Sequence, residues 1–205
     1  MFAVIFEVQP KADRWDEYLG LARLLKPEIE QIDGFIDNER FASRRTKGRL
    51  LSLSTWRDEK AVIRWRTQAV HHGVQEKGRF AVFEDYHLRV GEVSADTHAQ
   101  VLAAHRFDAT EVGAAKVVTI TELPPRAADI VVPESVVDQE VFESIYNPGK
   151  RLVLASWQDA AAAGRWTPSV TDGVRHRQVR VIRDYGMFDR REAPQYYPVV
   201  PRDAG

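Results

Sequence analysis

One pattern occurs twice in the chain. The stretch LSLSTWRDEKAVIRW, which ends at Trp65, returns as LVLASWQDAAAAGRW, which ends at Trp166. The offset is 101 residues for this tryptophan (166 − 65) and for the earlier pair, Trp56 and Trp157 (157 − 56). Each stretch predicts an apolar strand, an aspartate that begins a short helix, and a tryptophan on that helix. The repeat therefore predicts one structural unit that is present twice.

The first half of the chain predicts a complete βαββαβ unit. β-Branched and aromatic runs indicate the strands, and apolar residues three or four positions apart indicate the helices. We expect strands at 2–8, 35–43, 49–56 and 79–93, and helices at 13–32 and 58–70. Asp13 is the expected N-cap of the first helix, Pro27 an expected kink within it, and Gly34 its expected end. This order of elements is the ferredoxin-like split βαβ.

The second half predicts the same unit without its first helix. Its first strand, 117–123, is offset by 115 residues, because Glu122 corresponds to Glu7 (122 − 7), whereas the next two strands and the short helix are offset by 101 and the last strand by 99. Fourteen residues (115 − 101) are therefore missing between its first two strands. The remaining connection, PPRAADIVVPES, is too short and too rich in proline for a long helix.

The fold class predicted from this pattern is α+β, with two ferredoxin-like βαββαβ repeats that form a pseudo-dimeric α/β barrel. A single βαββαβ unit leaves one apolar face of its sheet bare, and the second unit can cover it. We expect a domain at 1–93, a linker at 94–115 with a short helix within 98–107, and a degenerate repeat at 116–205. A homodimer formed through the tail at 192–201 is an open alternative.

Charge and composition restrict the classes of partner. The net charge is −1, so no excess of basic residues indicates binding to nucleic acid or to a membrane surface. The chain has no cysteine, which excludes disulfides, cysteine-ligated metals and thiol catalysis. It has no apolar run of about 20 residues and no signal-peptide pattern, so we expect a cytoplasmic protein.

The first half resembles the antibiotic biosynthesis monooxygenase family of dimeric α/β barrels. The resemblance covers about 2–93 and is most specific in STWRDEKAVIRWRTQAVHHGVQEKGRFAVFEDYHLRV. This stretch is similar to the family pattern W-x-D-x-x-A-x-x-x-W, followed by His, by Q-x-x-G-R and by E-D-Y. The resemblance implies a ferredoxin-like barrel and cofactor-free oxygenation of electron-rich aromatic molecules such as anthrones and quinols. A related branch binds and degrades haem.

Three residues on the family pattern are candidate catalytic groups. His71 is at the family's histidine position, and an imidazole can remove a proton from a phenol or quinol near neutral pH. Arg79 and Tyr86 match the family's G-R and E-D-Y and can stabilise an anionic intermediate or bind a substrate oxygen. Each has a structural alternative: His71 as part of a helix C-terminus, Tyr86 as a packing residue that recurs as Tyr185, and Arg79 as a structural cation.

Three further residues are candidate substrate-binding groups. Trp65 can stack on a flat aromatic ligand, although its recurrence as Trp166 also fits core packing. Asn38 and Arg40 alternate with acidic residues on the second strand, so one polar pair must face a pocket or the barrel mouth. Which pair faces inward does not follow from the sequence.

Neither a metal nor a cofactor is expected. The six histidines form no H-x-x-x-H or H-x-H pair, and the chain has no G-x-G-x-x-G or P-loop. For haem degradation, the resemblance requires an asparagine on the first strand and a histidine about ten residues beyond Trp65, where Gln75 stands. The sequence thus predicts a cofactor-independent monooxygenase of a phenolic, quinol or polycyclic aromatic molecule. The alternatives are a non-catalytic small-molecule-binding or stress-response barrel and, ranked lower, a haem-binding member.

Overall fold

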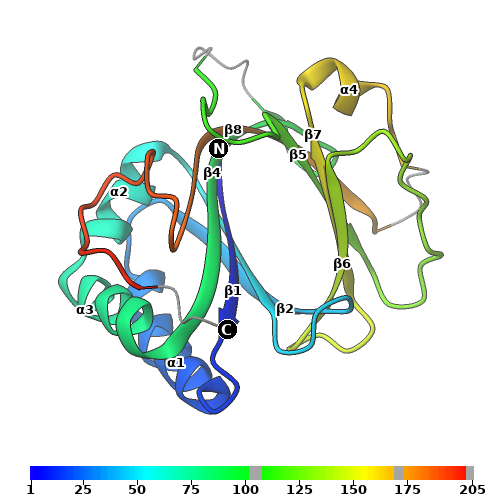
Figure 1. Cartoon of the computed structure of the whole chain (residues 1–205). Helices are drawn as coiled ribbons and strands as arrows, with labels where there is room; N and C mark the ends of the chain where they lie inside the picture. Colours follow the sequence, from blue (N-terminus) through cyan, green and yellow to red (C-terminus); the bar gives the residue numbers. More distant parts are fainter. Residues whose placement is uncertain (102–107, 169–172, 202–205) are drawn as a thin grey trace.

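Eight antiparallel strands close into one barrel within a single chain (Figure 1). The computed structural model describes residues 1–101, 108–168 and 173–201. The strand order around the barrel is β1-β3-β2-β6-β7-β5-β8-β4. The strands are β1 (Phe2–Pro10), β2 (Phe35–Ser43), β3 (Leu50–Trp56), β4 (Phe83–Asp96), β5 (Val117–Leu123), β6 (Asp138–Ser144), β7 (Arg151–Trp157) and β8 (Arg175–Gly186). In the described part of the chain, no helix has the length and apolar character needed to cross a membrane.

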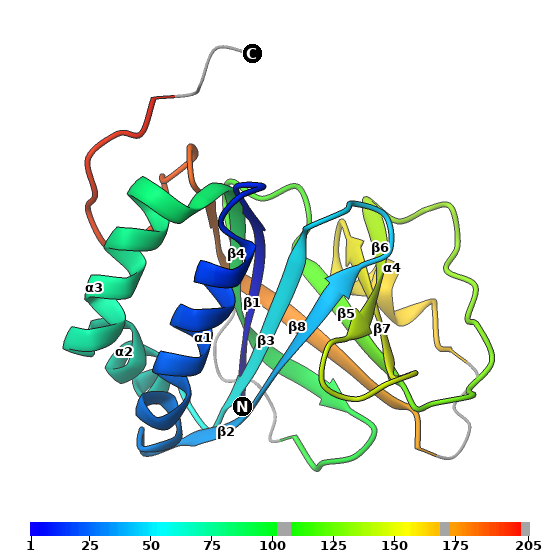
Figure 2. The same ribbon diagram turned by 90° about the horizontal axis from the view of Figure 1, so that it is seen from below.

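Helices cover the outer face of the first half of the barrel (Figure 2). They are α1 (Trp15–Glu30), α2 (Glu59–Thr67) and α3 (Ala69–Lys77), followed by the π-helical turn η1 (Gly78–Val82). The Asp58 side chain accepts a hydrogen bond from the Ala61 backbone N–H and caps α2, as the pattern predicts. α1 begins at Trp15 without a side-chain cap, so the expected cap by Asp13 is wrong. Pro27 lies inside α1.

In the structure, two of the predicted elements are each divided in two. The second helix ends at Thr67, because Gln68 has an extended backbone (ψ 133°) and its side chain caps a separate helix, α3. The fourth strand begins at Phe83 and not at residue 79, because residues 78–82 form η1. His71 therefore lies on a helix of its own. Of the short helix expected within 98–107, residues 98–101 are not helical and 102–107 lie outside the described residues.

The second half carries little helix over its part of the barrel. Residues 124–137, between β5 and β6, contain turns and no helix. Its one described helix is α4 (Ala160–Gly164), which Asp159 caps as Asp58 caps α2. The outer face of this half is covered by Val132, Trp166 and neighbouring side chains of the connection.

The interior of the barrel is a packed apolar core. Alternate residues of each strand point inward, so Ala3 and Ile5 of β1 pack inside whereas Val4 and Phe6 face the helices. Phe41 and Phe142, which are related by the 101-residue offset, are both fully buried in this core. The space available for a ligand is therefore not the barrel interior.

The two halves meet at two different seams. β2 and β6 pair over three residues only, with Phe41 opposite Ser144 and Ser43 opposite Phe142. This pairing is self-complementary, as in a two-fold dimer interface. At the other seam, β4 and β8 pair from His87 to Asp96, which gives the barrel its most extensive pairing between halves.

Inside the barrel, each half contributes an arginine that reaches across to the other half. Arg89 binds Glu7 (2.6 Å) in its own half and Ser156 Oγ (2.8 Å) in the other. Arg177 likewise binds Glu122 in its own half and Thr55 Oγ1 (3.0 Å) in the other. These two networks, which hold buried charges in pairs, are built on the same positions of the two units.

Candidate functional site

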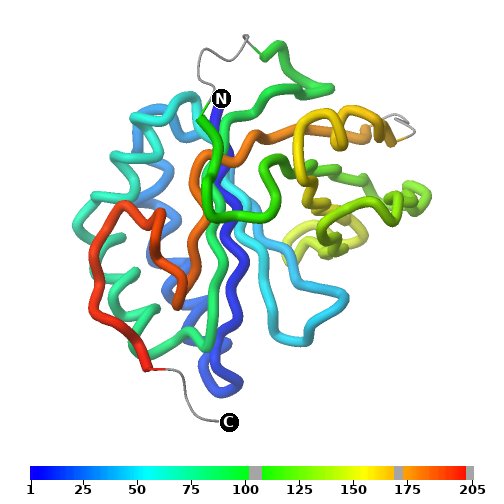
Figure 3. Tube along the Cα trace, turned by 45° about the horizontal axis from the view of Figure 1, so that its top comes forward, coloured from blue at the N-terminus to red at the C-terminus, as the bar shows by residue number. Residues whose placement is uncertain are grey.

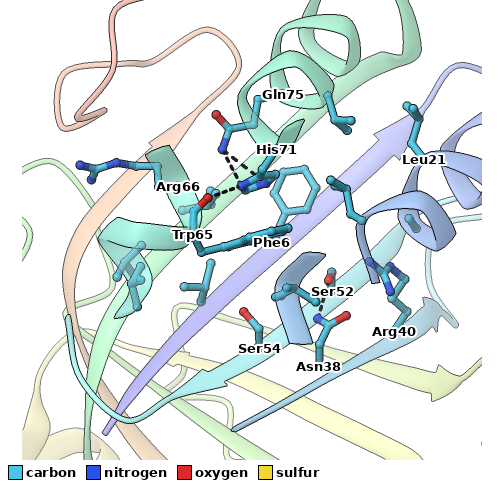
Figure 4. Close-up of a pocket in the computed structure, with 18 of the residues that line it drawn as sticks. Phe6, Leu21, Asn38, Arg40, Ser52, Ser54, Trp65, Arg66, His71 and Gln75 are labelled. Atoms are coloured by element: carbon cyan, nitrogen blue, oxygen red, sulfur yellow. Dashed lines mark hydrogen bonds between the residues drawn. The ribbon is translucent and has the colours of Figure 1, made fainter. Parts of the chain in front are cut away.

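A cavity of about 190 Å³ lies between the outer face of the sheet and α1–α3, in the first half of the molecule (Figure 4). Pockets for drug-sized ligands measure roughly 300–1,000 Å³, so this cavity fits a small molecule. Its walls are mainly apolar and come from β1, β4 and the three helices. The apolar lining includes Val4, Phe6, Leu21, Leu25, Ile29, Val62, Trp65, Val74, Phe83, Leu88 and Val90.

Trp65 and His71 form one wall of the cavity. Their rings are stacked, with 3.9 Å between centroids and 12° between planes. Trp65 in turn stacks at 6.5 Å on Trp56, which is fully buried below it. The turn at Gln68 places α3 so that His71 folds back onto the last turn of α2. Two of the predicted site residues are thus in contact and line the same cavity.

The protonation state of His71 follows from its surroundings. Burial lowers the pKa of His71 to about 4, so the imidazole is neutral at pH 7. Its Nδ1 lies 2.9 Å from the Trp65 carbonyl oxygen, which can only accept a hydrogen bond, so Nδ1 carries the proton. Nε2 is therefore the acceptor, and His71 can take a proton at that atom.

The floor of the cavity is polar. Asn38 and Arg40 of β2 and Ser52 and Ser54 of β3 line it. The Asn38 amide donates to Ser52 Oγ (3.0 Å) and to the Leu53 carbonyl (3.0 Å). The Nε–H of Arg40 is buried and has no hydrogen-bond partner among the described residues. Both predicted residues of β2 line the cavity, and a guanidinium beside it favours an anionic or oxygen-bearing ligand group.

Arg79 and Tyr86 do not line this cavity. Arg79 is 2% exposed and donates to the backbone oxygens of Met187 (2.7 Å) and Pro198 (3.3 Å). Tyr86 accepts a hydrogen bond from Arg190 through its hydroxyl (2.6 Å). Because η1 turns the chain before β4 begins, both side chains face the C-terminal segment. The structure therefore separates these two candidates from Trp65, His71, Asn38 and Arg40.

Gln75 and the C-terminal segment are parts of the site that were not predicted. Gln75 and Pro194 both line the cavity. Gln75 lies four positions after His71 on α3, and this helical spacing was a signal that the two side chains are neighbours. Pro194 has no comparable signal, because it is far away in sequence and lies in an irregular segment. No cluster of three or more histidine, aspartate or glutamate side chains in metal-binding geometry occurs among the described residues.

Comparison with known proteins gives one family match and one full-length relative. The model of the family "Antibiotic biosynthesis monooxygenase" matches residues 1–77. A protein of Pyricularia oryzae named "Jasmonate monooxygenase ABM" is 43% identical over 217 residues, which cover 97% of this chain and 99% of that protein.

Two solved structures are similar to this chain at low sequence identity. An aldoxime dehydratase in complex with butyraldoxime matches with a TM-score of 0.56 and 9% identity, over 88% of this chain and 79% of that chain. An antibiotic biosynthesis monooxygenase matches with a TM-score of 0.33 and 21% identity, over 35% of this chain and 76% of that chain. The aldoxime dehydratase is similar in fold alone, and its activity is not carried over.

Proposed function

Because the chain belongs to the antibiotic biosynthesis monooxygenase family, we propose that it is a monooxygenase and that its substrate binds in the cavity between the sheet and α1–α3. The observation that carries this proposal is the composition of the cavity. Its walls are mainly apolar, its floor holds the Arg40 guanidinium, and a neutral imidazole lies beside it. Such a site suits a small, largely apolar molecule with one oxygen-rich end.

Jasmonate is the first substrate to test. It is a small cyclopentanone with a carboxylate at one end and an unsaturated hydrocarbon chain at the other. In the proposed complex, the hydrocarbon part contacts the apolar walls and the carboxylate pairs with the Arg40 guanidinium. The relative with a matching length and 43% identity carries this substrate in its name, which supports the choice. Hydroxylation of a C–H bond consumes O₂ and two electrons and releases water, so this reaction requires a two-electron reductant.

A phenolic or quinol substrate, oxygenated without a cofactor, is the second candidate. The observation that favours it is the acceptor Nε2 of His71 next to the flat face of Trp65. Nε2 takes the phenolic proton, and the resulting anion passes an electron to O₂. The two radicals combine at a ring carbon that bears a hydrogen, and the peroxide anion takes the proton back from the His71 imidazolium. The resulting hydroperoxide loses water to leave a ketone. A pKa of about 4 makes the imidazole a weak base, so the new anion must stabilise the imidazolium beside it.

Oxygen uptake distinguishes the candidates. The protein is supplied with jasmonate or with a naphthoquinol, each with and without ascorbate as reductant, and products are analysed by mass spectrometry under ¹⁸O₂. A jasmonate oxygenase incorporates one ¹⁸O atom only with the reductant, whereas a quinol oxygenase consumes O₂ without it. Arg40→Met weakens the first reaction and His71→Ala abolishes the second. Binding without O₂ uptake for every compound contradicts the proposal and favours a non-catalytic binding protein; a Soret band on titration with haem favours a haem protein.

A further inference from the structure

The C-terminal segment 187–201 runs along α2 and α3 (Figure 3). Arg79 holds it at two points by donating to the backbone oxygens of Met187 and Pro198. A further hydrogen bond joins Gln195 Nε2 to the Arg66 carbonyl of α2 (3.3 Å). Because Arg79 is buried and its hydrogen bonds are charge-assisted, this attachment is stronger than a contact between exposed side chains.

Tyr197 brings this segment to the helix that carries His71. Its hydroxyl donates to Gln75 Oε1 (3.1 Å). The tyrosine ring stacks on His72 (5.8 Å between centroids), and the guanidinium carbons of Arg190 and Arg79 lie 5.3 and 6.0 Å from its centre. The neighbouring Tyr196 is 89% exposed. The two tyrosines are thus adjacent in sequence, and one of them is tied to α3.

The hydrogen bond from Tyr197 orients the amide of Gln75. Because Oε1 accepts from the hydroxyl, the amide nitrogen is turned toward His71. It lies 3.3 Å from Nδ1 and 3.4 Å from Nε2 of the imidazole. An atom in the ring plane at equal distances from both nitrogens would collide with the carbon between them, so the amide nitrogen lies over a face of the ring. Figure 4 shows Gln75 and Trp65 on opposite sides of His71.

We propose that Gln75, oriented by Tyr197, is a positioning residue that clamps the imidazole of His71 against Trp65. Trp65 covers one face of the ring, Gln75 covers the other, and the Trp65 carbonyl fixes Nδ1. The lone pair of Nε2 lies in the ring plane and is blocked by neither neighbour. The inference rests on the proposed function in so far as His71 is the proton acceptor, and it assigns the C-terminal segment to that site.

The clamp predicts a spectroscopic signature that needs no substrate. Ring protons stacked on an indole are shifted upfield by its ring current, so the His71 ring protons of the full-length protein are expected well upfield of those of the other histidines. Gln75→Ala releases the ring and moves these signals toward ordinary histidine positions. Tyr197→Phe keeps the aromatic ring but removes the hydrogen bond, and gives a smaller shift in the same direction. Tyr196→Phe is the matched control and leaves the His71 signals unchanged.

Kinetics provide the second readout. Loss of one orienting hydrogen bond is expected to lower kcat about fivefold in Gln75→Ala and about threefold in Tyr197→Phe, with KM changed less than about twofold. Tyr196→Phe retains wild-type kinetics. Unchanged His71 signals in Gln75→Ala overturn the inference, whatever the activity. Absence of turnover in wild type, together with shifted signals in the variants, overturns the proposed function and leaves the clamp in place.

Discussion

The outer faces of the two halves of the barrel serve different purposes, although their strands correspond. In the first half, three helices stand over the sheet and leave a cavity. In the second half, the connection between β5 and β6 lies over the sheet, and Val132 and Trp166 pack into the equivalent space. The Trp166 indole N–H donates to the Val131 carbonyl (3.1 Å), so the connection itself is held in place.

The residues of the sheet floor differ in the corresponding way. At the 101-residue offset, Arg40, Ser52 and Ser54 of the cavity floor correspond to Val141, Val153 and Ala155. The latter three pack in the apolar cluster under the connection. A polar floor under a cavity can bind a ligand group, whereas an apolar floor stabilises the fold by burial. This difference supports the proposal that the ligand binds in the first half.

The largest effect is expected where the two halves are alike, in the arginines of the barrel interior. Arg89→Met and Arg177→Met each leave a carboxylate in the barrel with one fewer partner, so each should lower the free energy of unfolding by about 3–5 kcal/mol. Urea unfolding followed by circular dichroism measures this. Arg191→Met, which removes an exposed ion pair, should change stability by less than about 1 kcal/mol. A large loss of stability in only one of the two variants, Arg89→Met or Arg177→Met, would show that the two arginine networks are not equivalent.

The second effect tests the difference between the halves through the paired tryptophans. Trp166→Ala should cost about 3–5 kcal/mol of stability, because it removes a side chain packed in the filled half. Trp65→Ala should cost less, roughly 2 kcal/mol, since one side of this indole already borders a cavity. Ligand binding should show the reverse order, with loss in Trp65→Ala only. Thermal shift with jasmonate or a quinol measures both quantities. Equal effects on binding would contradict the proposal that the ligand binds in the first half.

The fold could be predicted from the sequence because its main signals are periodic. The constant offset of 101 residues between Trp56 and Trp157 placed two strand–helix units in register, and the change to 115 at Glu7 and Glu122 located the missing helix. The family model, which covers residues 1–77, and the eight-stranded barrel agree with the predicted fold class. The boundary between η1 and β4 could not be predicted in the same way. Residues 79–82 read RFAV, which resembles a strand, but they complete a π-helical turn.

The site was predicted only in part because its geometry depends on tertiary contacts. Trp65, His71, Asn38 and Arg40 line one cavity. Trp65, Asn38 and Arg40 lie on elements whose periodicity was recognisable, whereas His71 was indicated by the family pattern and lies on α3, which was not predicted. Arg79 matched the family pattern, but its contacts are backbone oxygens of a segment more than 100 residues away. No periodic signal in that irregular segment indicates where it packs, so the role of Arg79 in holding it required the structure.

The pH dependence of stability compares a histidine in each half. Burial lowers the pKa of His71 and of His176 to about 4, so protonation between pH 6.5 and 4 favours the unfolded chain. The contribution of these two neutral histidines to the free energy of unfolding is fully present above pH 6.5. It falls toward pH 4, by at most about 1.4 kcal/mol per pH unit for each histidine. At His87, burial is outweighed by hydrogen bonds to Asp184 and Glu7, which raise its pKa, so its contribution is lost only above pH 6.5.

Urea titrations at several pH values measure this slope. His71→Ala and His176→Ala should each reduce the slope by the equivalent of at most one bound proton, which is about 1.4 kcal/mol per pH unit. A slope unchanged in both variants would assign the acid sensitivity to other groups.

The most selective effect on function is expected from exchanging the floor of one half for that of the other. Arg40→Val with Ser52→Val reproduces Val141 and Val153 in the first half. Stability should fall by about 1–3 kcal/mol, because the exchange removes the hydrogen bond between Arg40 and the buried Tyr18 hydroxyl, while Asn38 keeps its hydrogen bond to the Leu53 carbonyl.

Affinity for a carboxylate ligand should fall about tenfold or more in this variant, since a charge-assisted hydrogen bond is worth about 1.5–3 kcal/mol. Affinity for an uncharged quinol should change much less, which makes the quinol the matched control in calorimetric titrations. An equal loss for both ligands would mean that the exchange closes the cavity, and the polar floor would then serve to keep space open and not to select a charged substrate.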